Sequence, residues 1–258
     1  MALEHCILYI VVFLYGIIIG SFLNVCIYRI PKRESIVTVG SHCVCCNHRL
    51  RWYDLFPLFS WLFLKGKCRY CGAGISPQYP VVEAVNGILY LAVFYVNGWN
   101  TDSVLYCVMV SVLLVISVID YRTMLIPVGA EIILLAVGGV HLLLHLNDWL
   151  YYVAGFVFAG LFLLLCALLF RGATGKSGLG LGDVELMACA GLCIGWGHAL
   201  FAIAIGSVLG AVIQGIRMGI TKEKGKFPFG PYLSLGVWIA LLWGSQIYEW
   251  YVRQFLSL

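Results

Sequence analysis

Charged side chains are scarce in this chain of 258 residues, because Asp, Glu, Lys and Arg together make up only 11% of it. A soluble globular domain carries about 25% charged residues. Hydrophobic residues account for 62% of the chain. This composition excludes an ordinary soluble domain and predicts an all-α polytopic membrane protein with one small soluble insert.

The first apolar run, residues 7–26, lacks the small-residue cleavage site that would mark a removable signal peptide. The run is long enough to cross a bilayer, which needs about 20 apolar residues. We therefore expect it to be retained as an uncleaved first membrane helix.

Lysine and arginine are missing from every second loop of the chain. We expect eight membrane helices, the sixth of them short, at about 7–28, 80–97, 103–119, 126–145, 150–170, 184–197, 199–217 and 230–248. All 16 basic residues except Arg253 then fall after the first, third, fifth and seventh segments. The positive-inside rule places these four loops in the cytoplasm and both termini outside.

The cytoplasmic loops differ greatly in how many of these basic residues they hold. They carry Arg29, Lys32, Arg33, Arg49, Arg51, Lys65, Lys67 and Arg69 in the first, Arg122 in the second, Arg171 and Lys176 in the third, and Arg217, Lys222, Lys224 and Lys226 in the fourth. This pattern predicts three regions: a first membrane helix (1–30), a cytoplasmic cysteine-rich insert (31–79) and a multi-helix membrane domain (80–258).

The insert contains two Cys-x-x-Cys pairs, Cys43 with Cys46 and Cys68 with Cys71, separated by 21 residues. Two such pairs can place four thiolates tetrahedrally around zinc. An insert of this size builds only a weak core, so that a metal would stabilise it. The spacing therefore predicts a structural zinc site made by these four cysteines.

Other interpretations of the insert remain open. His42, Cys45 or His48 could replace one of the four ligands, although we expect Cys45 to be a bystander because adjacent residues seldom both face one metal. A disulfide pair is disfavoured in the reducing cytoplasm, and a thioredoxin-like motif would need a βαβ context that is missing here. The surrounding basic residues favour contact with anionic lipid rather than nucleic acid.

Two aspartates end apolar or glycine-rich stretches: Asp120 follows residues 111–119, and Asp183 follows Gly178–Gly182. In the predicted topology both lie at the cytoplasmic face. Acids at a membrane boundary are costly and indicate function. Two carboxylates that share one proton can hydrolyse a peptide, since the ionised one takes a proton from water and the protonated one donates to the scissile carbonyl. No metal is then required at this site.

Each aspartate also has a simpler interpretation. Asp183 could be a helix N-cap, and Asp120 could pair with Arg122 or lie solvated at a helix end. The glycines could cradle a phosphate, with Lys176 and Arg171 steering the anion, but they read G-x-G-x-G rather than G-x-G-x-x-G and no strand precedes them. The joint position of the two acids favours the catalytic interpretation.

In this order, the motifs resemble those of the type IV prepilin leader peptidase family. They are Gly20–Pro31 (GSFLNVCIYRIP), the paired cysteines with Trp61–Cys68 (WLFLKGKC) between them, Ile75–Glu83 (ISPQYPVVE) with Gly87, Asp120 with Ile126–Pro127, Gly180–Asp183 (GLGD) and Phe227–Pro231 (FPFGP). Two positions depart from the family's pattern. Val44 stands where proline is common, and Glu185 stands where lysine is frequent, a change that would alter either contacts with the leader or the local pKa.

The resemblance implies a bifunctional aspartic peptidase and N-methyltransferase of the bacterial inner membrane, serving pilus, secretion or competence systems. Asp120 and Asp183 would be its catalytic pair, with Gly180 and Gly182 completing the GxGD motif. The substrates would be prepilins and pseudopilins, cut after the glycine that ends a short basic leader. The enzyme would then methylate the new N-terminal residue, with S-adenosylmethionine as the methyl donor. Glu83 and Gly87 are the candidates for binding that cofactor, although Glu83 could instead be an acid near a helix N-terminus, where the macrodipole favours it.

Two other classes of function compete with this one. A transporter could use Asp120 and Asp183 to carry protons or metal ions, but both acids lie at one face rather than the midplane, and no inverted repeat is visible. A membrane scaffold could recruit cytoplasmic partners through the zinc insert, but it would leave both aspartates without a role.

Overall fold

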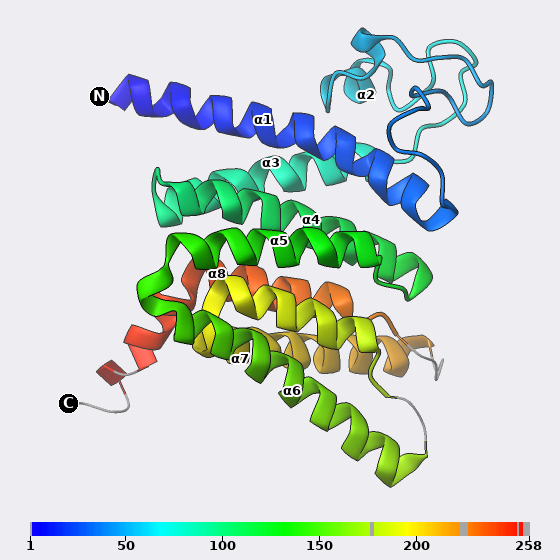
Figure 1. The fold of residues 1–258 in the computed structure, drawn as a ribbon. Helices are drawn as coiled ribbons and strands as arrows, with labels where there is room; N and C mark the ends of the chain where they lie inside the picture. Colours follow the sequence, from blue (N-terminus) through cyan, green and yellow to red (C-terminus); the bar gives the residue numbers. More distant parts are fainter. Residues whose placement is uncertain (1, 176–177, 222–226, 252, 255–258) are drawn as a thin grey trace. The chain divides into compact units, whose positions relative to one another are not determined.

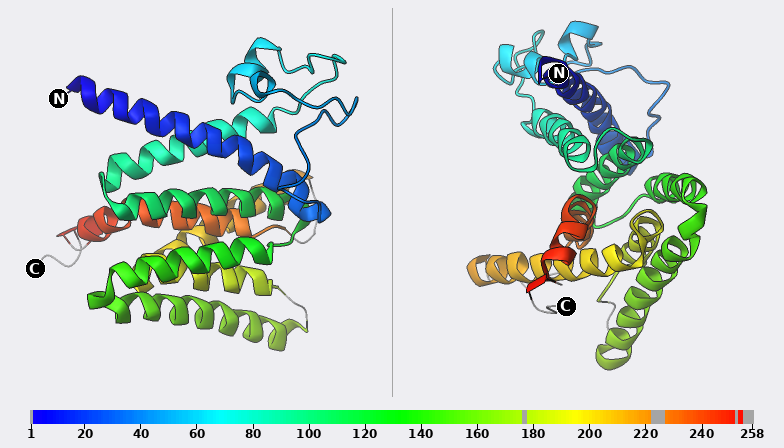
Figure 2. Two further views of the ribbon diagram at one scale, coloured as in Figure 1. Left: turned by 45° about the horizontal axis from the view of Figure 1, so that its top comes forward. Right: turned by 90° about the vertical axis from the view of Figure 1, so that its left-hand side faces the viewer.

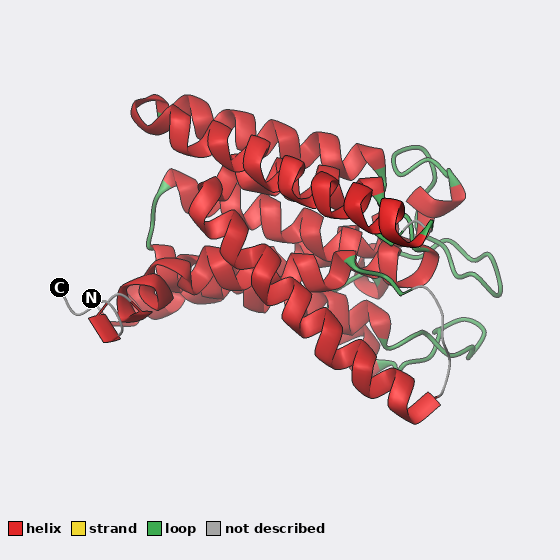
Figure 3. Cartoon of the chain, turned by 90° about the horizontal axis from the view of Figure 1, so that it is seen from below, coloured by secondary structure: helices red, strands yellow, loops and turns green. Residues whose placement is uncertain are grey.

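The computed structural model describes residues 2–175, 178–221, 227–251 and 253–254 (Figures 1 and 3). Within these ranges the chain is helical, with two isolated β-bridges and no strand. The helices are α1 (Ala2–Arg29), α2 (Phe59–Phe63), α3 (Gln78–Asn97), α4 (Thr101–Thr123), α5 (Val128–Leu144), α6 (Trp149–Thr174), α7 (Leu181–Thr221) and α8 (Gly230–Tyr251). Short 3₁₀ turns cover Ile30–Lys32, Trp52–Asp54 and Leu146–Asp148.

Five described helices are long and apolar enough to cross a membrane, which confirms the predicted helical membrane protein. They cover Glu4–Lys32, Gln78–Asn97, Thr101–Thr123, Leu146–Thr174 and Leu181–Ile220, and Val128–Leu144 is a shorter apolar helix. The basic residues Lys176, Lys222, Lys224 and Lys226 lie outside the described residues.

The chain divides into two compact units, Met1–Val115 and Ile116–Leu258, and the division runs through α4. In the first unit, α1 and α3 pack against each other through glycines. A Cβ atom at position 16 would lie 2.7 Å from the Cα of Gly87, and one at position 20 would lie 2.7 Å from the Cα of Glu83. The buried side chain of Asn86 donates to the Gly16 carbonyl at 2.7 Å. Small residues thus bring the two backbones together, as is usual between membrane helices.

The insert leaves this helix pair after α1 and rejoins it at α3, and Figure 2 shows it in light blue and cyan. The guanidinium of the buried Arg29 donates to three carbonyls of the segment that follows it, those of Ser35, Val39 and Gly40. The indole of Trp61 in α2 donates to the Ile75 carbonyl at 3.2 Å. Side-chain bonds to the backbone therefore hold the insert in a defined conformation although it has little regular structure.

In the second unit, α6 packs tightly against the first half of α7. A Cβ atom on Gly155 would collide with the carbonyl oxygen of Gly191 and lie 2.7 Å from the carbonyl carbon of Gly195. On α5, a Cβ atom at position 138 would carry less strain but still lie 3.0 Å from the Cβ of Leu192. The first half of α7 is therefore in close contact with both α5 and α6.

Within α7 the chain reverses at Gly195, whose φ of 77° and ψ of 169° are not helical. Beyond this residue the second half of α7 runs back along α8, since Gly244 faces His198 and the amide of Gln214 donates to the hydroxyl of Tyr232 at 2.9 Å. Figure 1 shows the two halves in yellow and gold. The sequence places a helix break between residues 197 and 199, whereas the structure places the reversal at Gly195, because a positive φ strains any residue except glycine.

We expect Gly155→Ala to destabilise the protein, because the new methyl group has no room against the backbone of α7. Overpacking of this kind costs about 1–3 kcal/mol. Thermal unfolding of the purified protein in detergent should therefore show a lower midpoint. The matched control is Gly139→Ala, since nothing lies within 4 Å of a Cβ atom there. An equal effect of both substitutions would contradict the close packing of α6 on α7.

Candidate functional site

Asp120 lies in the last turn of α4, and its side chain is buried, with the residue only 5% exposed. Its Oδ2 atom accepts the backbone N–H of Gly230 at 2.9 Å. Gly230 is the first residue of α8, where backbone N–H groups have no partner within the helix. A Cβ atom at position 230 would lie 2.8 Å from the same oxygen. Glycine is therefore needed there for α8 to begin against the carboxylate.

Asp183 lies in the first turn of α7 and is 8% exposed. Its Oδ2 atom accepts the N–H of Gly180 at 3.2 Å. Gly180 directly precedes the helix, and Asp183 is its third residue. In a capping box, the side chain of the third helical residue likewise accepts the backbone N–H of the residue before the helix. The structure thus places Asp183 inside the helix rather than at the N-cap position that the sequence left open.

The two motif glycines both lie where a side chain would be crowded. A Cβ atom on Gly180 would be 3.1 Å from Oδ2 of Asp183, and one on Gly182 would be 3.1 Å from the Cβ of Ile126. Gly182 therefore lets the connection between α4 and α5 approach the start of α7. This approach brings the end of α4, which carries Asp120, toward Asp183.

The two buried carboxylates lie within electrostatic range of each other. Each is bonded to one backbone N–H, and no ion pair among the described residues includes either of them. Two carboxylates in such surroundings are most stable when they share a single proton. The arrangement can therefore supply an acid and a base to one reacting group.

The four predicted cysteine ligands of the insert come together. The Sγ atoms of Cys43, Cys46, Cys68 and Cys71 all lie within 4.8 Å of one another, and the Sγ atoms of Cys43 and Cys71 are 3.8 Å apart. The cluster is formed by two loops that are 21 residues apart in the sequence. Four converging sulfur atoms fit a metal ion.

Both loops have the same backbone geometry. The carbonyl of Cys43 accepts the N–H of Asn47 and that of Cys68 accepts the N–H of Gly72, each at 2.9 Å. Asn47 and Gly72 have positive φ values of 53° and 71°. Glycine and asparagine are the residues that adopt this conformation most readily. Each loop is therefore a tight turn that points both of its thiols to one side.

The thiols differ in their protonation. The backbone N–H groups of Cys46 and Cys45 lower the pKa of Cys43 to about 6. The N–H of Ala73 also acts to lower the pKa of Cys71, but desolvation and hydrogen bonds with three neighbouring thiols outweigh it and raise the pKa to about 12. A cluster without metal thus retains protons, and metal binding must release them. Binding therefore weakens as the pH falls.

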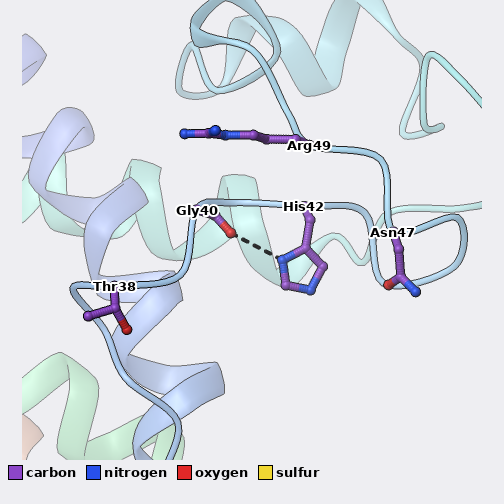
Figure 4. Close-up of a pocket in the computed structure, with 5 residues that line it drawn as sticks. All are labelled: Thr38, Gly40, His42, Asn47 and Arg49. Atoms are coloured by element: carbon purple, nitrogen blue, oxygen red, sulfur yellow. Dashed lines mark hydrogen bonds between the residues drawn. The ribbon is translucent and has the colours of Figure 1, made fainter.

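The alternative ligands lie outside this group of four. Cys45 is exposed, and the ring of His48 packs against that of Tyr70 in a tilted arrangement, with 3.7 Å between the centroids. The Nδ1 atom of His42 is bonded to the Gly40 carbonyl at 3.1 Å (Figure 4). The open pocket drawn there is lined by Thr38, Gly40, His42, Asn47 and Arg49.

Glu83 and Gly87 lie one turn apart on α3, on the side that faces α1. The buried carboxylate of Glu83 accepts the backbone N–H of Leu58 at 2.7 Å. Leu58 has an unusual φ of 61° and directly precedes α2. Gly87 is covered by α1, since a Cβ atom there would lie 2.7 Å from the ring of Phe13. Glu83 is therefore the residue through which α3 holds the insert.

Three residues near the aspartates were not identified as site residues from the sequence. Gly230 lies within the FPFGP motif, which gave no hint of a bond to Asp120. Glu131 is an acid within an apolar segment, and this rarity could have marked it. Glu185, seen only as a departure from a pattern, lies against Glu131.

Comparison with known proteins gives consistent matches along the chain. The family described as "Bacterial Peptidase A24 N-terminal domain" matches residues 14–97, and the "Type IV leader peptidase family" matches residues 107–215. No solved structure matches the chain.

Curated relatives match over nearly their whole length. The protein from Aeromonas hydrophila is 35% identical over 95% of this chain and 94% of its own. The protein from Stutzerimonas stutzeri is 36% identical over 92% and 91%, and that from Pseudomonas aeruginosa is 35% identical over 93% and 92%. All three are named prepilin leader peptidase/N-methyltransferase.

We expect Cys43→Ser and Cys68→Ser each to abolish metal binding, because each removes one of four converging ligands from a different loop. Metal bound per protein molecule, measured by mass spectrometry after purification and dialysis, should fall close to zero. The control is Cys45→Ser, which changes an exposed thiol outside the cluster. Loss of metal from this control, with retention in the other two variants, would refute the ligand assignment.

Proposed function

The chain belongs to the type IV leader peptidase family, and we propose that it cleaves the basic leader from prepilins and pseudopilins and then N-methylates the new N-terminal residue. The observation that carries the peptidase activity is the buried pair of Asp120 and Asp183, which lies within the segment matched by the peptidase family. The peptidase and methyltransferase names of the relatives give no support to the alternative of a transporter.

In the proposed cleavage, one proton is shared by Asp120 and Asp183. The ionised carboxylate takes a proton from water, and the resulting hydroxide attacks the scissile carbonyl carbon while the protonated carboxyl group donates to its oxygen. Collapse of the tetrahedral intermediate breaks the C–N bond, and the leaving amine takes up a proton from the pair. A hydroxyl group of the intermediate returns a proton to the aspartates as the new carboxyl group forms, so that the pair again holds a single proton. The N–H groups of Gly230 and Gly180 hold the two carboxylates in place throughout.

We propose that the chain crosses the bacterial inner membrane eight times, with the active site at the cytoplasmic face and both termini outside. The reversal at Gly195 supports this count, since it makes α7 two segments. Arg122 and Arg171 lie in the last turns of α4 and α6, at the same end of the unit as the aspartates. The positive-inside rule assigns that end to the cytoplasm, where a basic leader would be retained.

We propose that the metal of the insert (31–79) is zinc in a structural role. Four zinc–sulfur bonds of about 2.3 Å in a tetrahedron place the sulfur atoms about 3.8 Å apart, and the Cys43–Cys71 distance of 3.8 Å agrees with this value. Four thiolates around a single ion leave no coordination position for a substrate. The metal would therefore stabilise the insert, which connects the first helix (1–30) to the membrane domain (80–258) along the chain.

We propose that methyl transfer depends on Glu83 and Gly87, with S-adenosylmethionine supplying the methyl group. The two family matches support a separate site, because these residues lie in the N-terminal match and both aspartates lie in the other. Since Gly87 is covered by Phe13, its contribution would be to let α1 pack beside Glu83. The carboxylate of Glu83 would orient the insert at Leu58 and attract the amine to be methylated.

We expect Asp120→Asn and Asp183→Asn each to reduce leader cleavage by about 100-fold to 10,000-fold, because either change removes one partner of the acid–base pair. Cleavage of a purified prepilin in detergent, followed by mass spectrometry, measures this effect. Asp148→Asn, at an exposed aspartate before α6, is the control and should cleave normally. Cleavage that survives both active-site substitutions would remove the aspartate pair from the mechanism.

We expect Glu83→Gln to lose methyl transfer while leader cleavage continues, because the change removes the negative charge without touching Asp120 or Asp183. The cleaved product should then lack the methyl mass when S-adenosylmethionine is present. Glu34→Gln, at an exposed acid of the same unit, is the matched control. Methylation by Glu83→Gln at the wild-type rate would contradict the role of this carboxylate.

A further inference from the structure

Glu131 is a buried acid that the proposed chemistry does not use. It lies in the first turn of α5, is 6% exposed, and its Oε1 atom has no hydrogen-bond partner. Burial of a polar atom without a partner is costly, and burial of a charge is more so. A side chain kept in this state is expected to have a partner during part of the protein's working cycle.

The group opposite Glu131 is also an acid. The carboxyl group of Glu185 lies close enough to that of Glu131 for the two to interact electrostatically, and Cys189 lies one turn further along α7. No ion pair among the described residues joins either glutamate to a Lys or Arg of the chain. Two facing carboxylates repel each other unless a proton or a cation lies between them. The pair therefore forms an anionic site without a cation from its own chain.

The pair is placed beside the catalytic centre. Glu185 is two residues from Asp183 on α7, and Glu131 opens α5 just after Ile126, which contacts Gly182. Glu185 is exposed while Glu131 is buried. The pair therefore presents one exposed and one buried carboxyl group at the end of the unit where the substrate would be cut.

A basic side chain fits this site better than a metal ion does. A structural zinc site has four protein ligands and calcium takes six to eight oxygen ligands, whereas no described group of three or more His, Cys, Asp or Glu residues includes Glu131 or Glu185. An ammonium or guanidinium group has several N–H donors and can satisfy two carboxylates at once. On binding, it would release the proton shared by the pair to solvent.

We infer that Glu131 and Glu185 form an anionic subsite that takes a Lys or Arg side chain of the substrate's leader. This inference rests on the proposed function, since it needs a leader that carries positive charge. The subsite would position the leader while Asp120 and Asp183 act on the bond that follows it. Its effect should therefore appear chiefly in KM rather than in kcat.

The test compares two prepilin substrates, one with its basic leader and one in which every Lys and Arg of the leader is replaced by Gln. The kcat and KM of the full-length protein in detergent are measured for both. We expect wild type to lose about 10-fold to 100-fold in kcat/KM on the neutral leader, the usual effect of losing hydrogen bonds between charged groups. The E131Q/E185Q variant should cleave both substrates with the same low kcat/KM.

A variant that still prefers the basic leader as strongly as wild type does would overturn the inference. So would an equal loss on both substrates that leaves this preference intact, because that pattern indicates a structural role only. E185Q alone, at an exposed position, keeps the comparison available if the double variant does not fold, and it should weaken the preference. E249Q, at an exposed glutamate of α8, is the control and should keep the full preference.

Two further arms separate the alternatives. The E185K variant should regain activity on a leader that carries Glu in place of its basic residues. If magnesium chloride abolished the wild-type preference at constant ionic strength and left E131Q/E185Q unaffected, the pair would be a metal site and the inference would be wrong. If wild type cleaved neither substrate, the proposed function would itself fail, and the inference would fail with it.

Discussion

Two acidic side chains can be kept buried near each other where the backbone supplies hydrogen bonds and the packing of the surrounding helices fixes their positions. Asp120 and Asp183 meet this condition through the N–H groups of Gly230 and Gly180. Both donors belong to helix starts, where backbone N–H groups have no partner within the helix. The position of the two aspartates therefore depends on the starts of α7 and α8 reaching the end of α4.

Close helix packing is what makes this convergence possible. The second half of α7 returns after Gly195, so that α8 begins beside Asp120 while the first half of α7 begins at Asp183. Glycines at the contacts of α6 with α7 and of α1 with α3 leave no room for even a methyl group. Because apolar burial drives little association between helices within lipid, such contacts stabilise the arrangement where hydrophobicity does not.

The insert is ordered by other interactions than close helix packing. It has little regular structure, and its order comes from four converging thiols, two tight turns and the bond between Leu58 and Glu83. A carboxyl group on α3 thus holds the insert, while Glu131 and Glu185 lie together in the second unit, near the aspartates.

The sequence by itself determined the helical membrane fold, because a scarcity of charge and long apolar runs act locally on each segment. It also singled out Asp120, Asp183 and the four cysteines, since their residue types and spacings are chemically unusual in such a chain. Only the tertiary structure placed Gly230 on Asp120, 110 residues away, and Glu185 against Glu131. These contacts depend on how α5, α7 and α8 pack. The residue types near each position do not indicate a partner so distant in the chain. The turn at Gly195 was decided in the same way, because a run of glycines and apolar residues permits a reversal at several points and packing against α6 and α8 selects one.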